Sequence, residues 1–88
     1  MSDQFDITQA VSLDFLRTEL ETGMTFAKVA LSANNEDKIR RNQLNARKAY
    51  DSFQRYKSRP PVSDADAEEL KAKAVELKKL LIKLGETL

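Results

Sequence analysis

The residues of this chain best suited to chemistry are the basic side chains between positions 38 and 59. This stretch carries eight lysines and arginines against one acid, Asp51, whereas residues 1–37 carry seven acids and two bases. The whole chain has a net charge of only +1, so its charge is segregated rather than in large excess. A cluster of cations attracts anions, and the chemistry that this pattern favours is therefore binding to an acidic partner.

The side-chain types on which most enzymes depend are missing from the sequence. The chain has no His, the usual base at neutral pH, and no Cys, the usual thiolate nucleophile and zinc ligand. The closest acidic pairs, within residues 64–69, fall at the beginning of a predicted helix, where negative charge stabilises the helix itself. Two glycines are too few for a phosphate loop or a dinucleotide fingerprint. We expect neither enzymatic activity nor a bound metal or cofactor.

The elements that position the basic residues are predicted from apolar residues that recur at spacings of three and four. We expect helices over about residues 7–33, 36–57 and 64–84. Asn35 and Ser63 suit the N-caps of the second and third helices, and Pro60-Pro61 ends the second. Because the joints are short, successive helices must be antiparallel. The predicted fold is one all-α domain, an antiparallel up-down-up three-helix bundle.

The apolar faces of these helices predict the core. The face of the third helix consists of Ala67, Leu70, Ala74, Leu77, Leu81, Leu84 and Leu88. The face of the second consists of Ile39, Asn42, Ala46, Ala49, Phe53 and Tyr56. The face of the first consists of Leu13, Leu16, Leu20, Met24, Ala27 and Leu31. Asn42 is the one polar member, and it needs a hydrogen-bond partner wherever it is buried.

Two features of the predicted helix ends and interiors stay open at this point. The first helix has two candidate starts, Asp6 with Gln9 or the later Ser12. Gly23 lies inside it, at a cost of about 1 kcal/mol relative to Ala, which indicates either a close helix approach or a local kink. At the other end of the chain, Gly85 suits a left-handed turn that terminates the third helix.

The basic residues of the second helix form the predicted binding surface. Arg41, Lys48 and Arg55 recur every seven residues, on a face separate from the apolar one. The predicted partner-binding residues are Arg40, Arg41, Arg47, Lys48 and Arg55. The leading hypothesis is a non-enzymatic protein–protein interaction module that presents this basic face to an acidic surface of another protein.

Two alternatives and a structural explanation compete with that hypothesis. A small nucleic-acid-binding protein would use the same helix, but Phe53 and Tyr56 belong to its apolar face, and a net charge of +1 is low for that class. Alternatively, Val75 and Ile82 beside the third apolar face either pack on its flank or support weak self-association, as in a structural homo-oligomer. The structural explanation is a solvated basic face, partly neutralised by Asp14, Glu19 and Glu21.

A known family offers a further comparison. From about residue 20 to residue 61, Gly23-x-x-Phe26 followed by Ala46-x-x-x-Tyr50 resembles a tetratricopeptide-like helical hairpin. The resemblance implies a scaffold that binds other proteins. A second repeat is absent, so the expected object is one hairpin closed by a third helix rather than a stacked array.

The cellular compartment is predicted from what the sequence lacks. No apolar run of 18 residues occurs, and the acidic N-terminal residues do not match the basic start of a secretory signal. The absence of Cys fits a reducing compartment. We expect a cytoplasmic protein with no membrane association.

Overall fold

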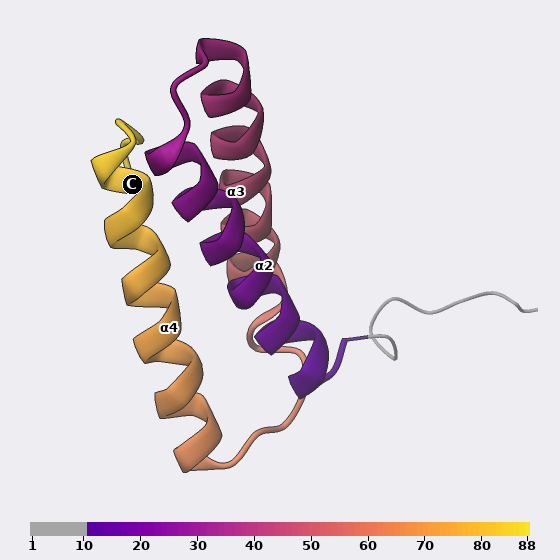
Figure 1. The fold of residues 1–88 in the computed structure, drawn as a ribbon. Helices are drawn as coiled ribbons and strands as arrows, with labels where there is room; N and C mark the ends of the chain where they lie inside the picture. Colours follow the sequence, from indigo (N-terminus) through magenta and orange to yellow (C-terminus); the bar gives the residue numbers. More distant parts are fainter. Residues whose placement is uncertain (1–10) are drawn as a thin grey trace, which may run out of the picture.

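The computed structural model describes residues 11–88, and these form three helices. The helices are α2 (Leu13–Ser32), α3 (Glu36–Tyr56) and α4 (Asp64–Lys83). Figure 1 shows that they run up, down and up, with connections at opposite ends of the molecule. The described residues contain no strand. The predicted all-α, antiparallel three-helix bundle is confirmed.

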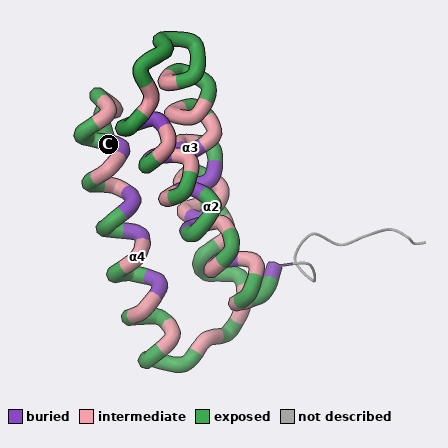
Figure 2. The backbone as a smooth tube through the Cα atoms, in the orientation of Figure 1, coloured by how far each residue is buried: buried purple, intermediate pink, exposed green. Residues whose placement is uncertain are grey.

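The core lies where the apolar faces of the three helices meet. Its largest fully buried side chains are Leu16 and Leu20 of α2 and Leu77 and Leu81 of α4, and Phe53 of α3 completes it. In Figure 2 the buried segments of α4 fall on its side toward α2. Helix α2 is central because it packs extensively on α3 and also on α4, whereas α3 and α4 meet over a much smaller area.

Local side-chain hydrogen bonds explain where each helix begins. Ser12 Oγ accepts from the Phe15 amide at 3.1 Å, and Asn35 Oδ1 accepts from the Lys38 amide at 3.0 Å. Ser63 Oγ accepts in the same way from the amide of Asp66, at 3.1 Å. Each cap satisfies one backbone donor that has no partner within the helix. The predicted caps Asn35 and Ser63 are confirmed.

Helix α2 begins at the later of the two starts predicted for the first helix. Ser12 has an extended backbone, with φ −131° and ψ 171°, and the helix starts at Leu13 rather than near residue 7. Of the two candidate starts, Ser12 is therefore the N-cap of α2. The other candidate, Asp6 with Gln9, lies outside the described residues.

The opposite end of the chain is terminated by Gly85. Its φ is +102°, a value that favours glycine, and the Gly85 amide donates to the carbonyl of Ile82 at 2.9 Å. The Glu86 amide then donates to the carbonyl of Leu81 at 3.0 Å. This turn directs the residues after α4 back toward α3, and it confirms the left-handed conformation predicted for Gly85.

The predicted apolar faces are buried along their centres but not at their ends. Ala67 and Leu88 at the two ends of the third face are exposed, as is Leu31 at the end of α2. Asn42 is half-buried, and its Nδ2 donates to the Lys38 carbonyl of the same helix at 2.8 Å, so its polar group is satisfied locally. None of α2, α3 and α4 combines the length and apolar character that a membrane span requires.

Candidate cationic interface on helix α3

Three of the predicted binding residues form a continuous positive stripe along α3. Arg41, Lys48 and Arg55 are exposed and recur every seven residues, so they follow one another along the same side of the helix. Within residues 11–88, none of the three forms an ion pair with a carboxylate. The guanidinium carbon of Arg55 lies 6.0 Å from the centre of the Tyr56 ring. We call these three residues the basic stripe.

The other two predicted binding residues lie away from the basic stripe. Arg40 Nη1 is 3.6 Å from Asp37 Oδ1 one turn earlier, and both side chains are largely exposed. Such an exposed pair is screened by water and contributes little to stability. Arg40 therefore remains accessible, with its charge partly offset by Asp37.

Arg47 is held by carboxylates of the same chain. Its Nε donates to Asp51 Oδ1 at 3.0 Å, and its Nη1 donates to Glu86 Oε1 at 2.6 Å. Gln43 Nε2 donates to the second oxygen of Glu86, also at 2.6 Å. The pKa of Glu86 is lowered, mainly by the hydrogen bond from Gln43 and next by the one from Arg47. The pKa of Arg47 is raised, mainly by its hydrogen bond to Asp51 and next by the one to Glu86. Arg47 thus fastens the residues after α4 to α3.

Among the described residues, no acid of α2 forms an ion pair with the basic stripe. Asp14 Oδ1 lies 3.8 Å from Arg17 Nη1 in its own helix, and Glu21 Oε2 lies 3.2 Å from Lys73 Nζ of α4. Glu19 forms no ion pair within the described part of the chain. The expectation that these acids partly neutralise the basic face is wrong for Asp14 and Glu21, because their partners are Arg17 and the α4 base Lys73.

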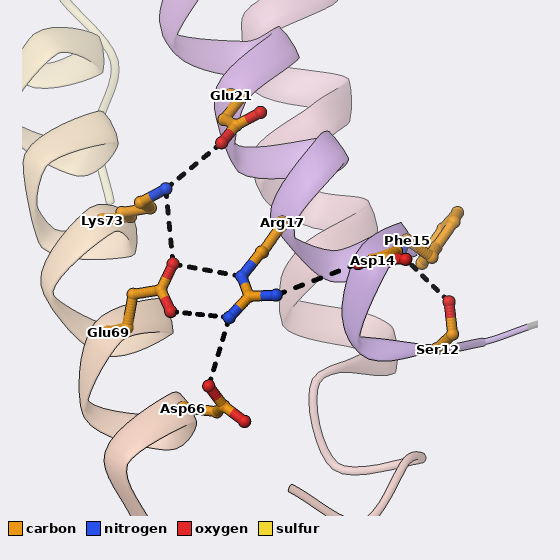
Figure 3. A network of polar contacts seen from close by, with 8 residues as sticks. All are labelled: Ser12, Asp14, Phe15, Arg17, Glu21, Asp66, Glu69 and Lys73. Carbon is orange, nitrogen blue, oxygen red and sulfur yellow. Dashed lines mark hydrogen bonds and ion pairs between the residues drawn. The ribbon is translucent and has the colours of Figure 1, made fainter.

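An ion network between α2 and α4 was not anticipated from the sequence. Arg17 donates through Nε to Glu69 Oε2 at 3.1 Å and through Nη2 to Glu69 Oε1 at 2.9 Å, as Figure 3 shows. The same Nη2 donates to Asp66 Oδ1 at 3.1 Å, and Lys73 Nζ is 3.5 Å from Glu69. The hydrogen bond from Arg17 is the main cause that lowers the pKa of Glu69. The available signal was the spacing of Asp66, Glu69 and Lys73 along one side of α4.

Two surface hollows flank the cationic side of α3. The first has a volume of about 290 Å³, and its lining residues are Lys48, Asp51, Ser52, Arg55 and Tyr56. The second has a volume of about 460 Å³, and its lining residues are Glu36, Ile39, Arg40, Gln43, Leu44 and Glu86. Leu44 is 53% exposed, which makes it the most exposed of the large apolar residues in the described chain. Neither hollow contains a group of three or more acids that could hold a metal ion.

Comparisons of the chain with protein-family models, with curated proteins and with solved structures give no match. These comparisons do not test the resemblance to a tetratricopeptide-like hairpin, which stays a prediction. Any functional assignment must therefore start from the basic stripe and its surroundings.

Proposed function

We propose that this protein is a non-enzymatic interaction module that binds an acidic surface of another protein. The observation that supports the proposal is the basic stripe, Arg41, Lys48 and Arg55, which is exposed and without a carboxylate partner among the described residues. A row of uncompensated cations attracts a complementary acidic surface and orients it during encounter. Arg40, which lies off the basic stripe one turn before Leu44, is exposed and available as a further contact. The proposed compartment is the cytoplasm, which fits a chain without Cys.

Two features favour a protein partner over nucleic acid. The ring of Tyr56 packs edge-on against Phe15, with ring centres 6.0 Å apart and planes at 75°, so this aromatic beside Arg55 already serves the packing of α2 on α3. Single-stranded nucleic acid is usually bound by aromatic side chains that are free to stack on bases. In addition, the exposed Leu44 offers an apolar contact that suits a protein surface.

Charge reversal with a matched control tests the proposal. The double variant Arg41→Glu/Lys48→Glu removes two cations from the basic stripe, and Lys71→Glu/Lys79→Glu makes the same change in net charge at exposed positions of α4. We expect affinity for a glutamate-rich peptide, measured by fluorescence anisotropy, to fall at least about tenfold in the first variant. The control should change it about twofold or less, and added salt should weaken wild-type binding.

The same assay separates the competing functions. Equal losses in the two double variants would show that net charge rather than the basic stripe is responsible, and would contradict the proposal. Tighter binding to a generic single-stranded RNA or DNA than to the peptide, with a steep salt dependence, would favour the nucleic-acid alternative.

A further inference from the structure

The cationic side of α3 carries an apolar residue at its centre. Leu44 lies three residues after Arg41 and four before Lys48, so on a helix these three side chains are neighbours. Leu44 is 53% exposed and, with Ile39, lines the hollow of about 460 Å³. A partner that contacts the basic stripe therefore meets an apolar contact at the same place.

The spacing of the charges selects the conformation of that partner. Residues seven apart on a helix are separated by about 10.5 Å along its axis, so the basic stripe extends over about 21 Å. A second helix that lies alongside presents side chains at the same seven-residue interval, always on the same side. An extended strand rises about 3.3 Å per residue and alternates its faces, so it does not match this interval over two repeats.

Two acids lie on this side of α3, and each is paired with an arginine of the same helix. Asp37 is seven residues before Leu44, and its Oδ1 lies 3.6 Å from Arg40 Nη1. Asp51 lies seven residues after Leu44, on the line next to the basic stripe. Its carboxylate already accepts hydrogen bonds from Arg47 at 3.0 and 3.2 Å. An approaching acidic partner therefore meets carboxylates that are already paired, next to the cations of the basic stripe.

Resting on the proposed function, we propose that the occupant of this surface is one amphipathic acidic α-helix of another protein. It places carboxylates at seven-residue spacing against Arg41, Lys48 and Arg55, and one apolar side chain against Leu44. A second copy of this chain is disfavoured as the occupant when α3 faces α3, because the two basic stripes would then repel each other.

Two synthetic peptides of identical composition test the helical partner. Each has about 20 residues, long enough to cover the stripe as a helix. In the first, glutamates recur every seven residues with one leucine a turn from the central glutamate; in the second, the order is scrambled. We expect the first peptide to bind at least about tenfold more tightly than the second and to gain helical circular dichroism on binding.

A pair of exposed apolar residues provides the matched variants. Leu44→Ala should weaken binding of the first peptide about five- to tenfold, because it removes the apolar contact. Ile82→Ala, at a position on α4 that is 50% exposed, should leave the affinity unchanged. Both variants should keep the wild-type circular dichroism, since neither side chain belongs to the core.

The outcomes separate the two proposals. Equal binding of the two peptides, together with no effect of Leu44→Ala, would overturn the helical partner while leaving the interaction module intact. Failure of both peptides to bind, or binding that Arg41→Glu/Lys48→Glu does not weaken, would overturn the module and the helical partner together. If the protein dimerises through α3 and the dimer blocks peptide binding, the occupant of this surface is a second copy. That result would overturn the proposal of a helical partner.

Discussion

Gly23 of α2 and Leu77 of α4 lie so close that a Cβ atom added to Gly23 would be 2.7 Å from Leu77 Cδ2. The same added atom would be 3.1 Å from the Cβ of Ala49 in α3. Leu77 is fully buried, so it has little room to move away. Gly23 thus marks the place where all three helices meet, and α2 runs unbroken through it. The predicted close helix approach is confirmed.

Gly23→Ala is expected to destabilise the bundle by about 1 kcal/mol. Alanine gains up to about 1 kcal/mol of helix propensity, but overpacking at a filled helix junction costs about 1–3 kcal/mol. Urea denaturation would measure the net change. Thr22→Ala, at the exposed neighbouring position, should change stability by about 0.5 kcal/mol or less. In a Leu77→Ala background, Gly23→Ala should destabilise the protein less, because the added methyl group then has room. If Gly23→Ala stabilised the otherwise wild-type protein, the expected clash would be contradicted.

Ser12→Ala tests where α2 begins. As the N-cap, Ser12 accepts the Phe15 amide hydrogen bond, so its replacement should cost about 1 kcal/mol in the free energy of unfolding. If the helix began near residue 7, Ser12 would be an interior position and alanine would stabilise the helix instead. Ser32→Ala at the other end of α2 is the control, and it should change stability by about 0.5 kcal/mol or less. Chemical denaturation gives the sign directly.

Acidification is expected to weaken the contacts that hold α4 to its neighbours. The folded state lowers the pKa of Glu69, through Arg17, and that of Glu86, through Gln43 and Arg47. A carboxyl with a lowered folded pKa contributes stability above its unfolded pKa of about 4.3, and this contribution is lost as pH falls through the folded pKa. Tm should therefore decrease as the pH is lowered from about 5 to about 3. Glu69→Gln/Glu86→Gln should show a shallower decrease over the same range, and an unchanged slope would contradict this cause.

Glu86→Gln is expected to strengthen binding of acidic peptides. It removes the carboxylate that accepts from Arg47 at 2.6 Å, and it removes a negative charge from the edge of the hollow beside Leu44. Affinity should rise about two- to fivefold by fluorescence anisotropy, as expected for one partly exposed charge. Glu76→Gln, at an exposed position of α4, makes the same chemical change without releasing Arg47. Equal gains in the two variants would indicate a net-charge effect only.

Self-association through α4 stays a prediction, and the exposure of two apolar residues of α4 indicates where the contact would form. Val75 and Ile82 are 46% and 50% exposed, so each keeps about half of its surface available for contact with another chain. We expect weak association at high concentration, measured as a concentration-dependent mass by sedimentation equilibrium. Val75→Gln/Ile82→Gln should remove that dependence, whereas Leu44→Gln should retain it. A monomeric mass for the wild type at millimolar concentration would exclude association through this strip.

The interface was predictable only in part. The exposure of Arg41, Lys48 and Arg55 follows from their seven-residue spacing opposite the apolar face of α3, which is a property of one helix. The role of Arg47 did not follow, because its partner Glu86 is distant in the sequence and reaches α3 only through the turn at Gly85.

The sequence by itself determines the three helices, their caps at Asn35 and Ser63, and the burial of Leu20, Phe53 and Leu77 at their centre. These features depend on local hydrogen bonds and on apolar periodicity, which each segment carries independently of the others. Only the tertiary structure decides that Arg17 contacts Glu69 and that Glu21 contacts Lys73. Such pairs depend on how far each helix is rotated about its axis and on which neighbour it packs against. Packing of the complete core sets both, and no single apolar pattern specifies either.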